Sequence, residues 1–103
     1  MGRAPRPQPR RLAAKLLTVR TRLGLTQPQL IKRLGYRKSP LYPSAISEYE
    51  AGKREPPALI LLAYARLAGV SVETLIDDEL DLPDVIPAPH RRGRVGDVTR
   101  RSR

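Results

Sequence analysis

Two short amphipathic segments follow one another within residues 23–56, and this pattern constrains the fold more than any other feature of the chain. In residues 26–34, Thr26 can cap a helix and apolar residues recur at helical spacing. In residues 43–51 the same spacing recurs, and Gly52 can end the helix in a left-handed conformation. The inward-facing residues are Leu30, Ile31, Leu34, Ile46 and Tyr49. Each segment is too short to be stable alone, so both must pack against other helices.

A short polar helix braced by a second helix can enter the major groove of DNA while its apolar face stays packed. The two segments have this form, because apolar residues occupy one face of each and polar residues the other. The stretch therefore predicts a helix-turn-helix, with the helix at about residues 43–51 placed in the major groove.

Three further helices are predicted around this pair. Residues 10–23 carry leucines and other aliphatic residues at helical spacing before Gly24, and Pro57 can start a helix that reaches Gly69. Ser71 can cap a last short helix. The chain has no Phe and no Trp, so its core must be built from small aliphatic residues and tyrosine. We expect an all-α fold, a compact five-helix domain over residues 10–80.

Both ends of the chain are expected to be flexible and basic. Residues 1–9 are rich in Pro and Arg and predict a disordered arm. Residues 81–103 form a Pro-punctuated and then Arg-rich tail. The ends hold nearly all of the formal net charge of +10.

Charge is also divided within the body of the chain. Residues 12–72 contain ten basic and three acidic residues, whereas residues 73–84 contain six acidic residues and no basic one. The basic part can face phosphates, and the acidic part should face away from them.

Composition argues against catalysis and against membrane insertion. The chain lacks Cys, and its single histidine, His90, lies in the predicted tail, so the usual nucleophile–base and metal constellations cannot be assembled. No apolar run approaches the ~20 residues of a membrane span. We expect a cytoplasmic protein that is not an enzyme and that needs no cofactor or metal.

Three motifs give the chain a family resemblance. They are LGLTQ at residues 23–27, ISEYEAGKREP at residues 46–56 and GVSVETL at residues 69–75. Together they resemble the Xre/Cro/CI-type helix-turn-helix family of phage-repressor-like domains. The resemblance implies a lambda-repressor-like fold, binding to double-stranded DNA and regulation of transcription.

The resemblance also implies roles for individual residues. Gln27 matches a glutamine that donates a hydrogen bond to a DNA phosphate from a helix N-terminus. Arg20 and Glu50 match a structural ion pair; the less favoured alternative is that Glu50 is a solvated acid. Lys53 and Arg54 match a turn that contacts phosphate after the recognition helix.

The groove-facing candidates belong to the recognition helix. By correspondence they are Ser44, Ala45, Ser47 and Glu48, preceded by Pro43 as a helix starter. Serine can bond several bases and glutamate can accept from the cytosine amino group. The set lacks Arg, Asn and Gln, so it offers none of the bidentate base contacts worth ~1–3 kcal/mol each.

The connector between the two helices departs from the family pattern. The distance from Gly35 to Ile46 is about five residues longer than the resemblance implies. This is either a longer surface loop at small entropic cost or an additional DNA contact through Arg37 and Lys38.

The resulting prediction is a sequence-specific regulator, in particular a repressor, that acts as a homodimer. Its dimer surface would use residues of the last two helices such as Leu75, Ile76 and Leu80. One alternative is an antitoxin-type regulator that binds a protein partner through its C-terminal segment at residues 82–89. Another is a non-specific nucleic-acid-binding protein driven by its arms.

Overall fold

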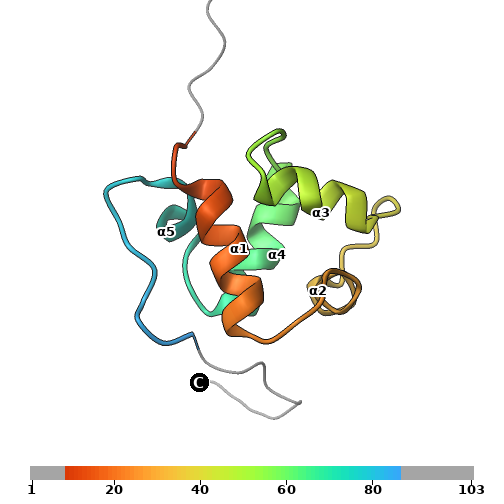
Figure 1. Ribbon diagram of the computed structural model, residues 1–103, viewed down its shortest axis with the longest axis horizontal. Helices are drawn as coiled ribbons and strands as arrows, with labels where there is room; N and C mark the ends of the chain where they lie inside the picture. Colours follow the sequence, from red (N-terminus) through yellow and green to blue (C-terminus); the bar gives the residue numbers. More distant parts are fainter. Residues whose placement is uncertain (1–8, 87–103) are drawn as a thin grey trace, which may run out of the picture.

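The computed structural model describes residues 9–86, and over this range it contains five α-helices and no strand (Figure 1). The helices are α1 (Leu12–Arg22), α2 (Gln27–Leu34), α3 (Pro43–Glu50), α4 (Ala58–Ala68) and α5 (Val72–Ile76). The predicted all-α, five-helix fold is confirmed for these residues. Of the arm predicted at residues 1–9 and the tail predicted at residues 81–103, residues 1–8 and 87–103 lie outside the described residues.

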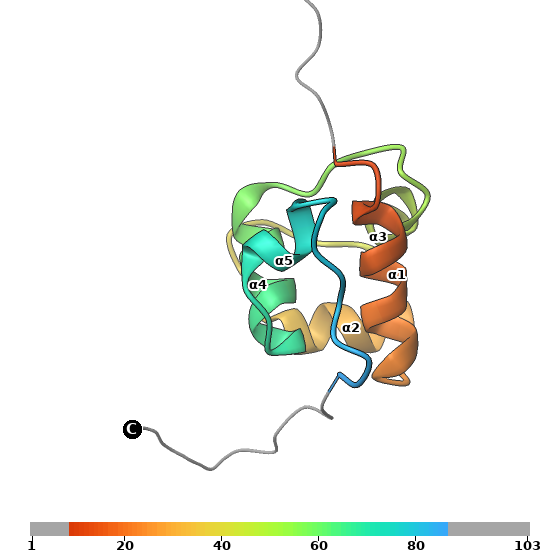
Figure 2. The same cartoon turned by 90° about the vertical axis from the view of Figure 1, so that its left-hand side faces the viewer.

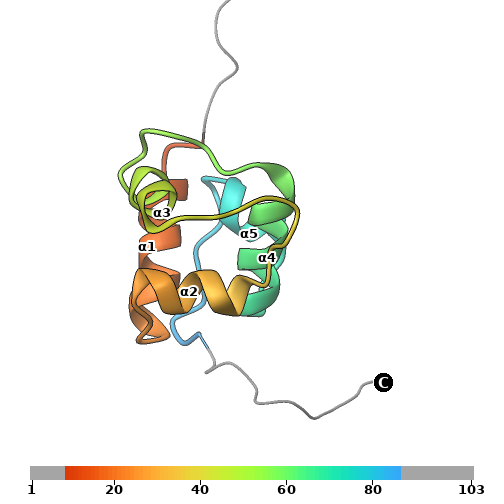
Figure 3. The same cartoon turned by 90° about the vertical axis from the view of Figure 1, so that its right-hand side faces the viewer.

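The helices enclose one core. α1 packs against α3 and α5, and α4 packs against α2 and α5, while α2 also contacts α3 (Figures 1 and 3). The fully buried side chains come from every helix: Leu16, Val19, Leu30, Ile46, Tyr49, Tyr64 and Leu75. Aliphatic residues therefore fill most of the core, together with two buried tyrosines.

The local helix signals form as the sequence predicts. The Thr26 hydroxyl accepts a hydrogen bond from the Gln29 backbone at 3.2 Å, and the Gln29 side chain accepts one from the Thr26 backbone at 2.9 Å. This reciprocal capping box satisfies two N–H groups that the helix itself cannot use. Ser71 caps α5 through the Thr74 backbone, and Gly52 follows α3 with a φ of 76°.

The start of α1 and the end of α5 with the residues that follow it satisfy each other's unpaired backbone groups. The Asp78 carboxylate accepts hydrogen bonds from the backbone N–H groups of Arg10 and Arg11, at 2.9 and 3.0 Å, where α1 has no side-chain cap of its own. In return, Lys15 reaches the end of α5 and donates to the carbonyl oxygens of Thr74, Asp77 and Leu80. These contacts satisfy groups at both helix ends and fix the two elements together.

Lys15 is a charged residue within the packed face of α1, and only 3% of it is exposed. Burial lowers the pKa of Lys15, and the neighbouring Arg11 lowers it further, against the raising effect of nearby carboxylates. Helical periodicity gives no signal for this residue, because a lysine on α1 is expected on the solvent face.

Residues 81–86 pack against the domain, although the predicted tail begins at residue 81. The Arg22 side chain donates to the carbonyl oxygens of Pro83 and Asp84, at 2.7 and 3.0 Å. Ile86 is buried in the core cluster, and Leu82 packs against it. The segment runs beside α1 in Figure 2. The prolines predict a linker, but Leu82 and Ile86 pack against the core instead.

The predicted dimer residues differ in accessibility. Leu75 is fully buried within the domain, so it cannot contact a second copy. Ile76 and Leu80 remain 40% and 38% exposed. Packing of α5 against α1 and α4 explains the difference, because it covers one side of this short helix.

Candidate nucleic-acid interface

α3 presents one polar face to solvent. Ile46 and Tyr49 anchor the helix in the core, and Pro43 occupies its first turn. On the opposite face, Ser44 and Ser47 are exposed. The helix thus has the two-sided character required for an element that is held by one face and contacts a ligand with the other.

Ala45 does not share this polar face. Only 9% of it is exposed, and it belongs to the core cluster with Ile46 and Tyr49. A base contact through Ala45 would require the helix to leave its packed position.

An ion pair fixes α3 to α1. The Arg20 Nε and Nη2 atoms donate to the two carboxylate oxygens of Glu50 at 2.7 and 3.0 Å. The remaining Nη1 donates to the carbonyl oxygen of Leu25 at 3.0 Å. The side chains are 18% and 7% exposed, so the pair is largely removed from water. The hydrogen bond to Glu50 raises the pKa of Arg20 further above its ordinary value.

Gln27 links the start of α2 to α3. Its Nε2 lies 3.1 Å from the Ser47 hydroxyl and 3.5 Å from Glu50 Oε1. Two residues that the sequence suggests as separate DNA contacts are therefore joined in one hydrogen-bonded group. An amide nitrogen carries two donors, and both are directed at α3, so donation to a phosphate would replace one of these contacts.

Glu48 and Arg54 form a second, more exposed ion pair. Arg54 Nη1 lies 2.8 Å from Glu48 Oε1, and the side chains are 56% and 45% exposed. The Arg54 guanidinium also lies over the Tyr49 ring, 5.6 Å from its centroid. The hydrogen bond to Glu48 raises the pKa of Arg54. Glu48, a predicted base contact, thus partly neutralises the charge of Arg54, a predicted phosphate contact.

The turn after α3 completes this surface. The Lys53 backbone N–H donates to the Glu48 carbonyl oxygen at 2.9 Å, which holds the turn against the end of the helix. The Lys53 side chain is exposed beside it. Gln27, Lys53 and Arg54 therefore flank the polar face of α3 from its two neighbouring segments.

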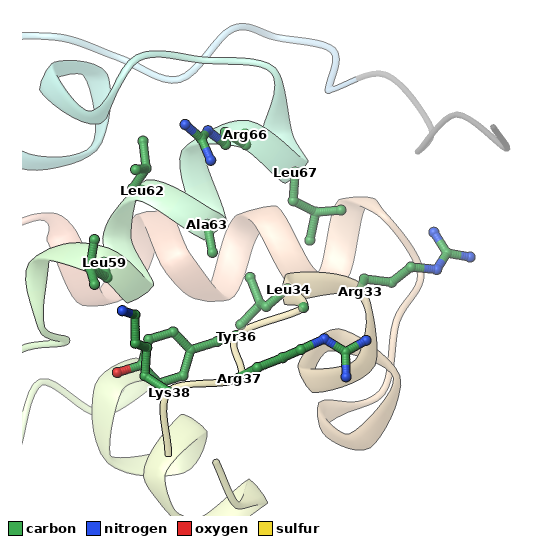
Figure 4. Close-up of a pocket in the computed structure, with 11 residues that line it drawn as sticks. Arg33, Leu34, Tyr36, Arg37, Lys38, Leu59, Leu62, Ala63, Arg66 and Leu67 are labelled. Carbon is green, nitrogen blue, oxygen red and sulfur yellow. The ribbon is translucent and has the colours of Figure 1, made fainter. Parts of the chain in front are cut away.

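Arg37 and Lys38 occupy another part of the molecule. The connector between α2 and α3 passes over α4, where these two residues line a groove together with residues of α4 (Figure 4). Tyr36, between them and α2, packs partly against the core. The additional residues of the connector thus lie beside α4.

Two further observations concern metal-ligating clusters and membrane-spanning helices. Within residues 9–86, no group of three or more His, Asp or Glu side chains is placed to hold a metal ion. None of the five helices described is long and apolar enough to cross a membrane. The arm arginines lie outside this range.

Residues 11–77 match a family model described as a helix-turn-helix domain, and the match covers α1 to α5. Searches among curated proteins and among solved structures found no match.

Proposed function

The chain belongs to the helix-turn-helix domain family, and from this premise we propose that it is a sequence-specific transcriptional regulator of the Xre/Cro/CI type. In this proposal it binds double-stranded DNA in the cytoplasm and represses transcription by occupying its operator. α3 enters the major groove.

The position of α3 is the observation that carries this proposal. The bidentate Arg20–Glu50 pair and the buried Ile46 and Tyr49 fix the helix, while its polar face stays open. Fixing a helix before binding lowers the entropic cost of association, because fewer groups must be ordered on DNA. A helix presented in this way can contact base edges without refolding.

Phosphate contacts are assigned to the residues that flank α3. Gln27 would donate from the start of α2, and Lys53 and Arg54 would contact the backbone from the turn after α3. Such contacts fix the position of the protein on the duplex but do not depend on sequence. Arg37 and Lys38 remain predicted phosphate contacts, although they lie beside α4.

Base contacts are assigned to Ser44, Ser47 and Glu48. Glu48 can accept from the cytosine amino group, provided that it separates from Arg54. Because serine contacts are adaptable, a single α3 would give limited discrimination. Two copies of the chain on related half-sites would double the contacts and fix their spacing.

The antitoxin-type alternative receives less support. It needs the segment at residues 82–89 to be available for a protein partner, but Leu82 and Ile86 already pack against the domain. Non-specific binding through the arms would leave the ordered arrangement around α3 without a role.

Selection of bound sequences from a random DNA pool tests the proposed function. We expect a two-fold symmetric consensus with half-sites about one helical turn apart. The Glu48→Gln variant should select a different base at one position in each half-site, because glutamine carries both a donor and an acceptor. An unenriched pool would contradict sequence-specific binding.

A further inference from the structure

A groove of about 600 Å³ lies between α4 and the connector that joins α2 to α3 (Figure 4). Its floor is apolar and includes Leu34 from α2 and Leu59, Leu62 and Leu67 from α4. Leu59 is 51% exposed, and Leu62 and Leu67 are only partly buried, so three leucines of one helix remain accessible along the groove. Contiguous apolar surface of this kind on a small domain indicates contact with a partner.

The rim of the groove is cationic on both sides. Arg33, Arg37 and Lys38 line it from α2 and the connector, and Arg66 lines it from α4. Figure 4 shows these side chains spread around the apolar floor, not gathered at one end of it. No acidic residue lines the groove, and residues 27–42 and 58–68 contain none. An occupant that matches this surface carries negative charge on both sides of an apolar stripe.

The four cations of the rim have no partner among residues 9–86. Within this range none of their side chains forms an ion pair or a hydrogen bond, whereas Arg11, Arg20 and Arg54 each bind a carboxylate. The fold therefore neutralises several of its other arginines but leaves the charges around the groove available to an external partner.

The described part of the chain does not supply this occupant. The acidic residues within 77–84 follow α5, and Arg22 holds the carbonyl oxygens of Pro83 and Asp84 beside α1, away from the groove (Figures 1 and 2). The ends of the chain have the wrong charge, because residues 1–8 contain no acid and residues 87–103 contain six arginines and one aspartate. The occupant is therefore a segment of another molecule.

The combination of floor and rim distinguishes between classes of occupant. DNA would supply anions but would leave the leucines uncovered, because its outer surface is a phosphate backbone. A small amphiphilic anion carries its charge at one end, whereas these cations lie on both sides of the floor. A helix with an apolar stripe between two rows of carboxylates matches both features, and amphipathic helices commonly bind in apolar grooves through such a stripe.

We propose that the groove between α4 and the connector docks an acidic amphipathic helix of a partner protein. The apolar stripe of that helix covers Leu59 and Leu67, and its carboxylates face Arg37 on one side and Arg66 on the other. The surface lies outside α3, so this interaction goes beyond the proposed binding of DNA and does not depend on it.

Fluorescence anisotropy of a labelled synthetic peptide with the full chain, in the absence of DNA, tests the proposal. The probe is a helical peptide of about 15 residues with leucines at i, i+3, i+4 and i+7 and glutamates on both sides of them. One comparison peptide has glutamine in place of every glutamate, and another has alanine in place of every leucine. We expect the probe to bind and each comparison peptide to bind at least about tenfold more weakly, because each lacks one of the two features that the groove matches.

Two variants of the chain test the rim and the floor separately. Arg66→Glu reverses a charge of the rim, and Arg66 is chosen because, unlike Arg37 and Lys38, it is not a predicted phosphate contact. Leu59→Ser removes apolar surface from the floor. Each variant should bind the probe at least about tenfold more weakly than the wild type, through charge repulsion in the first and loss of apolar burial in the second.

Each variant has a matched control outside the groove. Lys32→Glu reverses an exposed basic residue in the last turn of α2, and Leu17→Ser replaces a leucine of α1 that is 39% exposed. Both controls should bind the probe like the wild type. Circular dichroism of every variant verifies that it is folded.

Three results would overturn the proposal. The wild type does not bind the probe, or it binds the glutamine peptide equally well, or Arg66→Glu and Lys32→Glu weaken binding to the same extent. Decanoate provides a further comparison, because it joins an apolar chain to a single carboxylate. If decanoate binds the wild type as tightly as the probe and loses affinity in Arg66→Glu and Leu59→Ser, the groove holds a small amphiphile and the proposed helix is excluded.

Discussion

Tyr64 brings a hydroxyl into the core without a hydrogen-bond partner among residues 9–86. The side chain is fully buried between α4 and its neighbours. Burial raises the pKa of Tyr64 well above its ordinary value, and the nearby Glu50 carboxylate adds to the effect. An unpaired buried hydroxyl costs free energy, because it leaves its hydrogen bonds to water behind.

Tyr64→Phe should therefore leave the free energy of unfolding unchanged or raise it by up to about 1 kcal/mol. The ring keeps its packing, and only the unpaired hydroxyl is removed. Urea unfolding of the two proteins at pH 7 measures the difference. A loss of more than about 1 kcal/mol would mean that the hydroxyl is hydrogen-bonded in solution.

At the scale of the element, α3 depends on the ion pair between Arg20 and Glu50. Removing one partner leaves the other charge buried, so Glu50→Ala should lower the free energy of unfolding by roughly 3–5 kcal/mol. Replacing both residues by apolar ones should cost much less than the two single changes together. The preferred DNA sequence should not change, because Arg20 lies on α1 and the Glu50 side chain is only 7% exposed.

Thermal unfolding and DNA selection with the same variants check both parts of this expectation. Lys32→Ala, which alters an exposed residue of α2, serves as the control and should unfold like the wild type. If Glu50→Ala melts at the wild-type temperature, the pair does not position α3.

The contact between α1 and α5 has a pH dependence of its own. The backbone N–H groups of Arg10 and Arg11 lower the pKa of Asp78. The unfolded chain then binds more protons than the folded chain in the acid range, so stability falls as pH decreases there. The contribution of Asp78 is present above its unfolded pKa of about 3.9 and is lost as the pH falls through the lower folded value.

Asp78→Asn should therefore be less stable than the wild type at pH 7, and the difference should shrink below about pH 4. Denaturant unfolding at several pH values between 3 and 7 provides the comparison. Asp84→Asn is the control, because the Asp84 side chain is exposed and accepts no hydrogen bond from residues 9–86. A stability difference for Asp78→Asn that is the same at all pH values would show that its carboxylate does not cap α1.

The elements that sequence predicts well are those with local signals. Thr26, Ser71 and Gly52 mark helix ends through contacts within a few residues, and helical spacing marks the buried faces. The contacts of Lys15 and Asp78 join residues that lie 59 and 68 positions apart along the chain. Such contacts depend on how the helices pack, so no local pattern reveals them.

The candidate site divides in the same way. The packed position of α3 follows from its apolar residues. The pairing of Glu48 with Arg54 does not, because it depends on the conformation of the turn that brings Arg54 back beside α3. Likewise, the length of the connector is visible in the sequence, whereas its path over α4 depends on the tertiary structure.

The whole molecule is electrically asymmetric. Residues 12–72 carry most of the basic residues of the body and include α3 with its flanking cations, whereas the acidic residues 73–84 follow α4. Such a molecule would be oriented by the field of DNA before contact, because its basic part is attracted to phosphate and its acidic part is repelled. Residues 73–84 are then directed away from DNA.

The central claim is that α3 and its flanking residues contact DNA. Nuclear magnetic resonance titration of the full chain with a selected duplex tests it directly, since backbone amide shifts report contact residue by residue. We predict the largest changes at Gln27, along residues 43–50 and at Lys53 and Arg54, with little change along residues 72–76. Changes confined to the arms, with α3 unaffected, would contradict the account.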